Sequence, residues 1–337
     1  MASPVVTCDQ LRELEAPPST GLRRILQHAL CALPLLAGGV LLLQYFLVPN
    51  HGLNTATNVY PIFLAVFLIP LTATFAASFF SKRWYAWLTQ KAPLYTAVFL
   101  LLTAYDYLTL KTGRLMLPYF PWPDRVLLAI WEDRALLLDC IRNSLILLFA
   151  GYFAGAAAGL LSGIAAGWCK PVHYWIAPLI KILGPIPSTT WLPIILIVAS
   201  SLFRGSVFLI ALGVWYPVTV TSLTGVANVR KSYFEAARTL GASKRRLIFQ
   251  VAIPAAMPNI LQGLTQGMSV ACTALMVAEM MGVESGLGWY INWQRGWAEF
   301  AKMYAAVIVI CLTFTCVNFV LGRIRKRALR WQEGTIQ

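Results

Sequence analysis

The chain has 337 residues, of which 58% are hydrophobic and only 12% are charged, and its mean hydropathy is +0.67. Soluble domains carry roughly 25% charged residues, so this composition excludes a soluble enzyme, a disordered chain and a secreted disulfide scaffold, and indicates a bilayer protein. The net charge of +14 fits Lys- and Arg-rich cytoplasmic loops better than a nucleic-acid-binding surface, so no nucleic-acid partner is expected.

Eight stretches are long and apolar enough to cross a bilayer core, which takes about 20 residues of helix. In chain order they are residues 26–48, 60–80, 92–110, 141–166, 175–200, 203–226, 259–283 and 303–322. The first is too long for a signal peptide and lacks a small-residue cleavage site, so we expect it to remain. The sequence therefore predicts an all-α polytopic membrane protein.

The placement of Lys and Arg predicts the orientation of these spans. Eighteen of the 27 basic residues fall in the N-terminal tail, the C-terminal tail and the connections on the same side, and eight fall on the other side. Because basic residues are enriched in cytoplasmic loops, both termini are predicted to be cytoplasmic.

The fourth predicted span has a glycine at every fourth position. Repeated Gly-x-x-x-Gly leaves bare backbone along one helix face, where a second helix can pack closely. These glycines are Gly151, Gly155, Gly159, Gly163 and Gly167. The pattern predicts helix packing and carries no chemistry.

The fifth predicted span is interrupted by Pro185, Pro187 and Pro193. Proline removes backbone donors, and the freed carbonyls are tolerated at membrane depth where they are buried or line a wet cavity. A broken helix beside a solute path and a plain kink against a neighbouring helix both explain the pattern.

The longest internal polar segment, residues 227–258, reads as two short amphipathic helices joined by a bend. We expect the first helix at 232–240 with Gly241 as its C-cap, and a second from Ser243 to about residue 250. Pro254 and Pro258 are expected to end that second helix before the next span. A basic helix pair of this kind is suited to dock on another protein.

This segment also carries a spaced motif, Glu-Ala-Ala, three residues, Gly, nine residues, then aliphatic-x-aliphatic-Pro. It resembles the coupling-loop signature of ABC importer permeases. The matching residues are Glu235, Ala236, Ala237, Gly241, Val251, Ile253 and Pro254. The proline-broken segment at 185–193, and Val277 to Met280 followed by Gly286-Leu287-Gly288, are similar to the nitrate/sulfonate/taurine branch of that family. The resemblance covers about 92–330.

Three features depart from that branch. Leu147 stands where an Arg is common, Ala199 to Phe203 replaces an aromatic-Phe-Gly sequence, and the two helices at 26–80 have no counterpart in the usual six-helix core. These differences bear on the substrate and leave the coupling motif intact.

The resemblance implies a division of the chain into four parts. These are a cytoplasmic tail at 1–25, an extra transmembrane helix pair at 26–91, a permease core at 92–322 with its cytoplasmic coupling loop at 227–258, and a basic cytoplasmic tail at 323–337. The fold it implies is a six-helix ABC importer permease core with two extra N-terminal transmembrane helices.

The function implied is that of a permease subunit of an ATP-binding-cassette importer in a bacterial inner membrane. The solute would be a small anion of the sulfonate, taurine or nitrate type, delivered by an extracytoplasmic binding protein. The sequence has no Gly-x4-Gly-Lys-Ser/Thr phosphate loop, so separate cytoplasmic ABC ATPase subunits would hydrolyse ATP and this chain is not expected to be an enzyme. Since six helices hardly enclose a gated path, a second permease copy, forming a homodimer, is expected.

Candidates for the translocation path follow from the broken span and from one carboxyl group inside a predicted span. A carboxyl in a membrane span is costly and is a functional hypothesis by default, although Glu279 could instead steady the turn at 286–288. An aromatic group at 289–297 is interpreted as a membrane-interface belt or as a contact for a delivering partner. The path candidates are Pro185, Pro187, Ser188, Thr189, Thr190 and Glu279.

No metal or cofactor is expected. The seven cysteines form no Cys-x-x-Cys pair and the three histidines are scattered. An ATP-independent secondary transporter and a membrane-embedded enzyme remain as alternatives, but the first predicts internal repeats and the second a catalytic cluster, and neither is evident. Both also leave the 235–254 motif unexplained.

Overall fold

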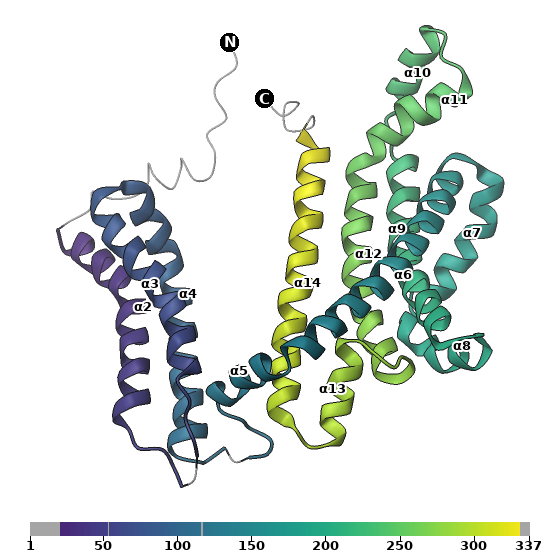
Figure 1. Cartoon of the computed structure of the whole chain (residues 1–337). Helices are drawn as coiled ribbons and strands as arrows, with labels where there is room; N and C mark the ends of the chain where they lie inside the picture. The colour runs from purple at the N-terminus through teal and green to yellow at the C-terminus, as the bar shows by residue number, and fades with distance from the viewer. Residues whose placement is uncertain (1–20, 53, 116, 331–337) are drawn as a thin grey trace. The chain divides into compact units, whose positions relative to one another are not determined.

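The computed structural model describes residues 21–52, 54–115 and 117–330, without the side chains of residues 21–28 and 282. Most of the predicted N-terminal tail and the last seven residues of the basic tail lie outside the described residues. The helices (Figure 1) are α2 (Gly21–Leu47), α3 (Val59–Phe80), α4 (Lys82–Asp106), α5 (Pro123–Glu132), α6 (Arg134–Trp168), α7 (Lys170–Leu183), α8 (Leu192–Val198), α9 (Leu202–Ala227), α10 (Lys231–Thr239), α11 (Lys244–Arg246), α12 (Ile253–Gly282), α13 (Leu287–Gly296) and α14 (Phe300–Ala328). No described residue lies in a strand, which confirms the all-α class.

Three short non-α helices complete the secondary structure. Two are π-helical turns, η1 (Tyr107–Lys111) at the end of α4 and η3 (Leu247–Ala252) before α12, and η2 (Ser188–Trp191) is a 3₁₀ turn before α8. Both π-helical turns continue directly into or out of a membrane-spanning helix, so they extend these helices and do not end them.

Seven described helices are long and apolar enough to cross a membrane, and α7 with η2 and α8 forms an eighth, broken span bent by 86°. Each of the eight predicted stretches corresponds to one of these elements. The third span begins at Lys82, ten residues earlier than predicted, and only Ser81 separates it from α3. Long basic side chains at a helix end extend their charged groups to the membrane interface. Lys82 and Arg83 can therefore form the first turn of the spanning helix α4.

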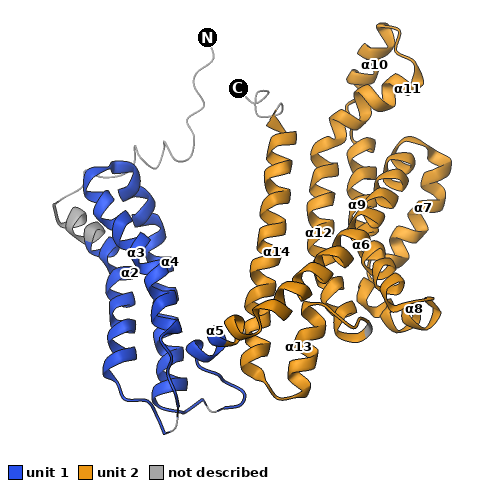
Figure 2. Cartoon of the chain, in the orientation of Figure 1, with its two compact units in different colours: residues 1–128 blue, residues 129–337 orange. Residues whose placement is uncertain are grey.

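The chain divides into two compact units, residues 1–128 and residues 129–337 (Figure 2). The prediction assigns residues 92–110 to the permease core, whereas in the structure α4 packs against α2 and α3 inside the first unit. The packing face of α4 carries Leu88, Ala92 and Phe99, all buried. Unit 1 therefore contains three packed spanning helices, α2, α3 and α4.

Two buried charged side chains cap helix ends in unit 1. The Lys111 ammonium donates to the carbonyl oxygens of Tyr45 and Val48, both at 2.7 Å, where α2 ends. The Asp124 carboxylate accepts from the backbone N–H of Tyr60 at 2.9 Å, where α3 begins. A cation at a helix C-terminus and an anion at an N-terminus are the favourable arrangement, and these pairings explain how both charges are tolerated in the interior.

Unit 2 is built around the contact of α6 with α9. The glycine stripe of α6 faces α9 so closely that a Cβ added to Gly159 would lie 2.8 Å from the Val218 Cβ, and one added to Gly163 would lie 2.6 Å from the Thr219 carbonyl oxygen. Any larger side chain would push the two backbones apart. α12 packs on α9 as well, so α9 contacts a spanning helix on each side.

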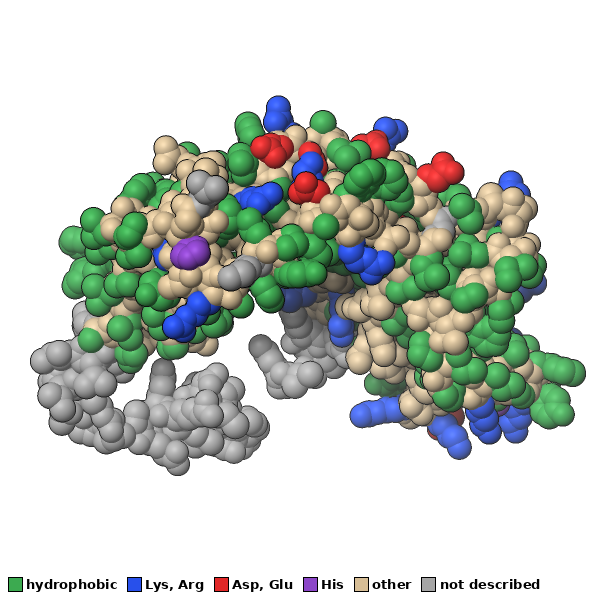
Figure 3. Space-filling model, turned by 90° about the horizontal axis from the view of Figure 1, so that it is seen from below, with side chains coloured by type: hydrophobic (Ala, Val, Ile, Leu, Met, Phe, Trp, Pro, Cys, Tyr) green, Lys and Arg blue, Asp and Glu red, His purple; other side chains and the backbone are tan. Residues whose placement is uncertain are grey.

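Hydrophobic side chains cover much of the surface in the view of Figure 3. Examples in unit 2 are Leu161 on α6 and Leu312 on α14, which are 73% and 67% exposed. Soluble monomers rarely expose apolar surface on this scale, so these faces are the ones expected to meet lipid.

We expect Gly159→Val to destabilise unit 2, because the added methyl groups would collide with Val218 across the α6–α9 contact. Overpacking of this kind costs about 1–3 kcal/mol, and thermal unfolding in detergent would report it. Gly322→Val is the matched control, since a Cβ at Gly322 on α14 meets nothing within 4 Å. Equal melting temperatures for the two variants would contradict the close α6–α9 contact.

Candidate functional site

The predicted coupling segment forms a helical hairpin between α9 and α12. α10 ends in a Schellman arrangement, in which the Ala242 N–H donates to the Ala237 carbonyl at 3.0 Å and the Gly241 N–H donates to the Arg238 carbonyl at 2.9 Å. Gly241 has a φ of +77°, a conformation that costs other L-residues roughly 1–2 kcal/mol. The backbone conformation of this bend therefore favours glycine at position 241.

The second helix of the hairpin differs from the prediction. From Lys244 the chain is helical without interruption through η3 and α12 to Gly282, so Pro254 and Pro258 do not separate it from the membrane span. Pro254 directly follows the π-helical turn η3, and local π adjustments of this kind allow a spanning helix to contain a proline.

Hydrophobic contacts anchor the hairpin on one side and leave it open on the other. Phe234 meets Trp168 of α6 with ring centroids 5.8 Å apart, and Ile253 packs beside the buried Ala252. Leu240 and Phe249 are 88% and 67% exposed. The hairpin thus presents an exposed apolar surface at its tip and has a fixed base.

The motif residues divide in the same way. Glu235, Ala236, Gly241 and Pro254 are exposed, while Ala237, Val251 and Ile253 are half-buried. Within the described residues the Glu235 carboxylate forms no ion pair or hydrogen bond with the rest of the chain, although basic residues follow it at Arg238 and Lys244. Its carboxylate is therefore free to bind a partner.

The broken span encloses one side of a cavity of about 350 Å³, completed by α9 and α12. Pro187, Ser188 and Thr189 line it, and Pro185 and Thr190 flank it. The other lining residues include Tyr216 from α9 and Gln266 and Thr273 from α12. None of the lining residues is charged.

Glu279 does not line this cavity. Its side chain is 1% exposed and lies at the end of α12, where one carboxylate oxygen accepts from the Ser144 hydroxyl at 2.6 Å and the other from the Gly288 N–H at 2.8 Å. The Ser144 oxygen in turn accepts from the Leu287 N–H at 2.9 Å. Two side chains from different spans therefore satisfy the first amides of α13.

This cap explains the glycines that follow. Gly286 has a φ of +139°, and a Cβ there would collide with the Glu279 carboxylate. A Cβ on Gly288 would lie 2.8 Å from the Glu279 Cβ. Sequence reasoning identified Glu279 and the glycine turn but missed Ser144, because a single serine in an apolar span carries no distinctive pattern.

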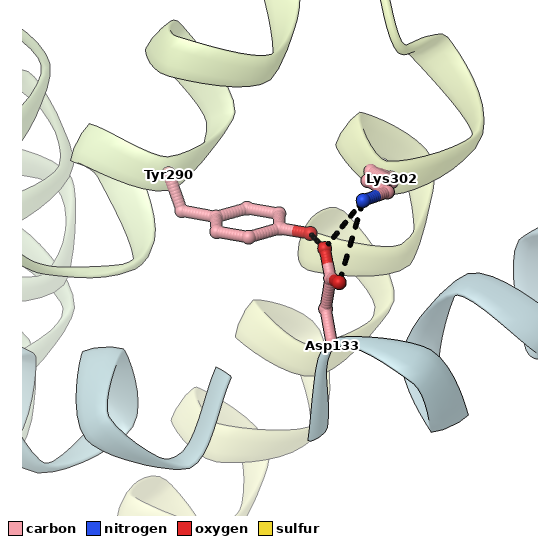
Figure 4. Close-up of polar contacts among 3 residues, drawn as sticks. All are labelled: Asp133, Tyr290 and Lys302. Atoms are coloured by element: carbon pink, nitrogen blue, oxygen red, sulfur yellow. Dashed lines mark hydrogen bonds and ion pairs between the residues drawn. The ribbon is translucent and has the colours of Figure 1, made fainter. Parts of the chain in front are cut away.

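A second polar cluster fixes the other side of α13 (Figure 4). The Tyr290 hydroxyl donates to Asp133 Oδ2 at 2.6 Å, and the Lys302 Nζ lies 3.1 Å from the same oxygen. Burial and the neighbouring Asp133 raise the pKa of Tyr290, so it stays a donor at all physiological pH values. The three residues tie the starts of α6 and α14 to α13.

The remaining aromatic residues of α13 lie along an exposed side of that helix. Trp289 and Trp293 stack with ring centroids 5.6 Å apart, and Trp293 and Trp297 are 51% and 68% exposed. Trp289, Trp293 and Trp297 therefore form one continuous aromatic surface, whereas Tyr290, predicted to belong to the same belt, is buried. The role of this surface at a membrane interface or against a partner stays a prediction.

Residues 155–330 match the family model for the binding-protein-dependent transport system inner membrane component. The match covers the C-terminal part of the glycine-lined helix α6, the broken span, the hairpin and α12 to α14. The chain belongs to this family. It is thus a permease of the ABC importer type.

Individual relatives place this permease in the branch predicted from the sequence. It is 31% identical over 157 residues to the taurine transport system permease protein TauC of Escherichia coli, covering 44% of this chain and 57% of that one. It is 30% identical over 184 residues to a Bacillus subtilis protein with the provisional name aliphatic sulfonates transport permease protein SsuC, covering 55% and 67%. The matched stretches thus span about half to two thirds of these relatives.

Solved structures agree on the fold. The permease superposes on a chain of an amino acid ABC transporter with a TM-score of 0.51 at 19% sequence identity, over 60% of this chain and 97% of the other. At this identity the likeness shows the fold alone.

We expect Glu279→Ala to loosen α13, because it leaves the buried Gly288 N–H without an acceptor at a cost of about 1–3 kcal/mol. Hydrogen exchange at the amides of Leu287 and Gly288 would quicken. Glu284→Ala, an exposed carboxylate in the same loop, is the control and should leave exchange unchanged. Exchange that is equally slow in both variants would show that the cap does not hold the turn.

Proposed function

We propose that this permease is one membrane subunit of an ATP-driven importer, with its hairpin bound to cytoplasmic ATPase subunits. The observation that carries the proposal is the hairpin itself. It places Glu235 and the αL glycine Gly241 on an exposed, apolar-tipped projection whose base is packed into the spans. Because the hairpin continues into α12, a displacement of its tip is transmitted to the cavity wall.

The solute path of the proposal runs along the broken span. Pro187, Ser188 and Thr189 line the cavity with α9 and α12, and a second copy of the chain completes the enclosure. Glu279 acts on the path indirectly, by holding the turn after α12. The similarity to taurine and sulfonate permeases supports a small anion as solute, delivered by an extracytoplasmic binding protein.

The proposed topology has both termini and the hairpin in the cytoplasm of a bacterial inner membrane. The exposed Lys244, Arg245 and Arg246 of the hairpin support it, since basic residues favour the cytoplasmic side. In this topology α2, α3 and α4 of unit 1 also span the membrane.

Capture of the tagged chain from native membranes in mild detergent tests the subunit assignment. We expect an ATPase with a phosphate-binding loop to copurify, because the apolar tip of the hairpin and the Glu235 carboxylate are uncovered within the described part of the chain. Mass spectrometry of the captured proteins is the measurement. Recovery without any ATPase, while uptake persists in the same membranes, would favour the secondary-transporter alternative.

Variants of the hairpin test the coupling role. Gly241→Pro should abolish ATPase capture or ATP-dependent uptake, because proline cannot adopt a φ of +77° and lacks the N–H that bonds Arg238. Gly241→Asn should retain most activity, since Asn tolerates this conformation. Glu235→Lys should weaken capture, and the exposed Glu299→Lys is its charge-matched control. Normal uptake and capture in both Gly241→Pro and Glu235→Lys would refute the coupling role.

A further inference from the structure

One face of α12 carries an unbroken row of uncharged polar residues. Between residues 259 and 273 every exposed position of this helix is polar, and the spacing alternates between three and four residues, which keeps them on one side. These residues, called here the polar stripe, are Asn259, Gln262, Gln266, Ser269 and Thr273.

The opposite face of α12 is the packed one. A Cβ on Gly267 would lie 3.2 Å from the Val214 side chain of α9, and Ala271 and Leu275 are completely buried. The polar stripe therefore lies on the open side of a spanning helix, and at Gln266 and Thr273 this side borders the cavity that α9 also lines.

Lipid is a poor solvent for such a surface. At 1.5 Å per residue the stripe is about 21 Å long, against a bilayer core of about 30 Å. Within the described chain, the side chains of Gln262, Gln266 and Ser269 form no hydrogen bond, so their donors would be unsatisfied in hydrocarbon. On the neighbouring spans the most exposed side chains include apolar ones such as Leu161 and Leu312, and exposed polar residues such as Thr315 and Thr224 are isolated, not aligned in a row. The stripe is thus built to face water.

Two cavities follow one another along the stripe. The cavity at the broken span is lined by Gln266 and Thr273, and a second, shallow and widely open cavity of about 520 Å³, nearer the hairpin, is lined by Gln262, Gln266 and Ser269. Gln266 borders both, so the two lie next to one another along the stripe, and together they are called here the track. Arg325, on α14 beside α12 (Figure 1), lines the second cavity.

The charge of this track is one-sided. No carboxylate lines either cavity, and Arg325 is the one charged residue among those that do. Amide N–H and hydroxyl groups donate hydrogen bonds to an anion without the strong attraction of a row of cations, so an ion is solvated and still released. A cation would find no carboxylate to replace its water.

We propose that the polar stripe of α12 and Arg325 form a water-filled track that conducts small anions along the permease. The inference rests on the proposed function for its solute and direction, and it adds residues of the path: Gln262, Gln266, Ser269 and Thr273 as neutral donors, with Arg325 attracting the anion at the hairpin end.

Thiol labelling of the assembled complex in open membrane fragments tests the track. In a background without the native cysteines, the variants Gln262→Cys, Gln266→Cys and Thr273→Cys are treated with an anionic and with a cationic methanethiosulfonate reagent of similar size. Rates are normalised to free cysteine. We expect all three positions to react. The anionic reagent should react severalfold faster at Gln262→Cys and Gln266→Cys, which share a cavity with Arg325, and the preference should be weakest at Thr273→Cys.

Two pairs of controls make the result specific. Leu312→Cys and Phe319→Cys on the apolar, exposed face of α14 should not react, since thiols in lipid do not ionise. In the Gln266→Cys background, Arg325→Gln should remove the anion preference, whereas Arg323→Gln should keep it, because Arg323 lines neither cavity and lies against the Phe319 ring.

Two outcomes would overturn the proposal. No labelling at the stripe would show a dry face, and oxidative cross-linking between copies at these unlabelled positions would then identify the second copy as its cover. Equal rates for both reagents would refute anion selectivity. Capture of the ATPase from the same membranes separates these outcomes from a failure of the proposed function, which is indicated when the ATPase itself is missing.

Discussion

The close approach of α6 and α9 is the constraint on which the rest of unit 2 depends. The glycines on α6 have no Cβ, so α9 packs directly against the α6 backbone. α12 also packs on α9, through Gly263 and Gly267. With α9 held between two spans, the hairpin that joins α9 to α12 has a rigid base. The cavity at the broken span has walls from the same two helices.

Three of the four buried charged side chains among the described residues cap the ends of helices, and the fourth, Asp106, accepts from the Gln44 side chain. Lys111 caps the end of α2, Asp124 the start of α3 and Glu279 the start of α13. Inside a membrane protein an unpaired charge is costly, but the free amides or carbonyls of a helix end offer several hydrogen bonds at one point. These charged groups stabilise the turns between helices, and none of them lines the two cavities of the proposed solute path.

The open face of α12 is polar through uncharged side chains instead. It has donors but almost no charge, and it extends from the broken span toward the hairpin along two adjacent cavities. A path for an anion needs enough hydrogen bonding to replace part of its hydration and too little attraction to trap it. The arrangement of neutral amides and hydroxyls with one arginine meets both requirements.

Several features of this protein were determined by sequence alone. The hydropathy of each span, the glycine spacing on α6 and the coupling motif at 235–254 are local patterns with a direct physical meaning, and they predict the all-α membrane class and the family. Gly241 as a C-cap is predictable for the same reason, because the αL bend needs only the residues beside it.

Tertiary structure decided the rest. The role of Glu279 depends on Ser144, which is 135 residues away, and on the amide of Gly288. The grouping of α4 with α2 and α3, and the continuation of the hairpin through Pro254 into α12, depend on packing and on a π-helical turn that no local pattern announces. The polar stripe is visible in the sequence as a 3-4-3-4 spacing of uncharged residues. Only the structure shows that this face is the open one, because burial is a property of neighbours that the chain brings together from a distance.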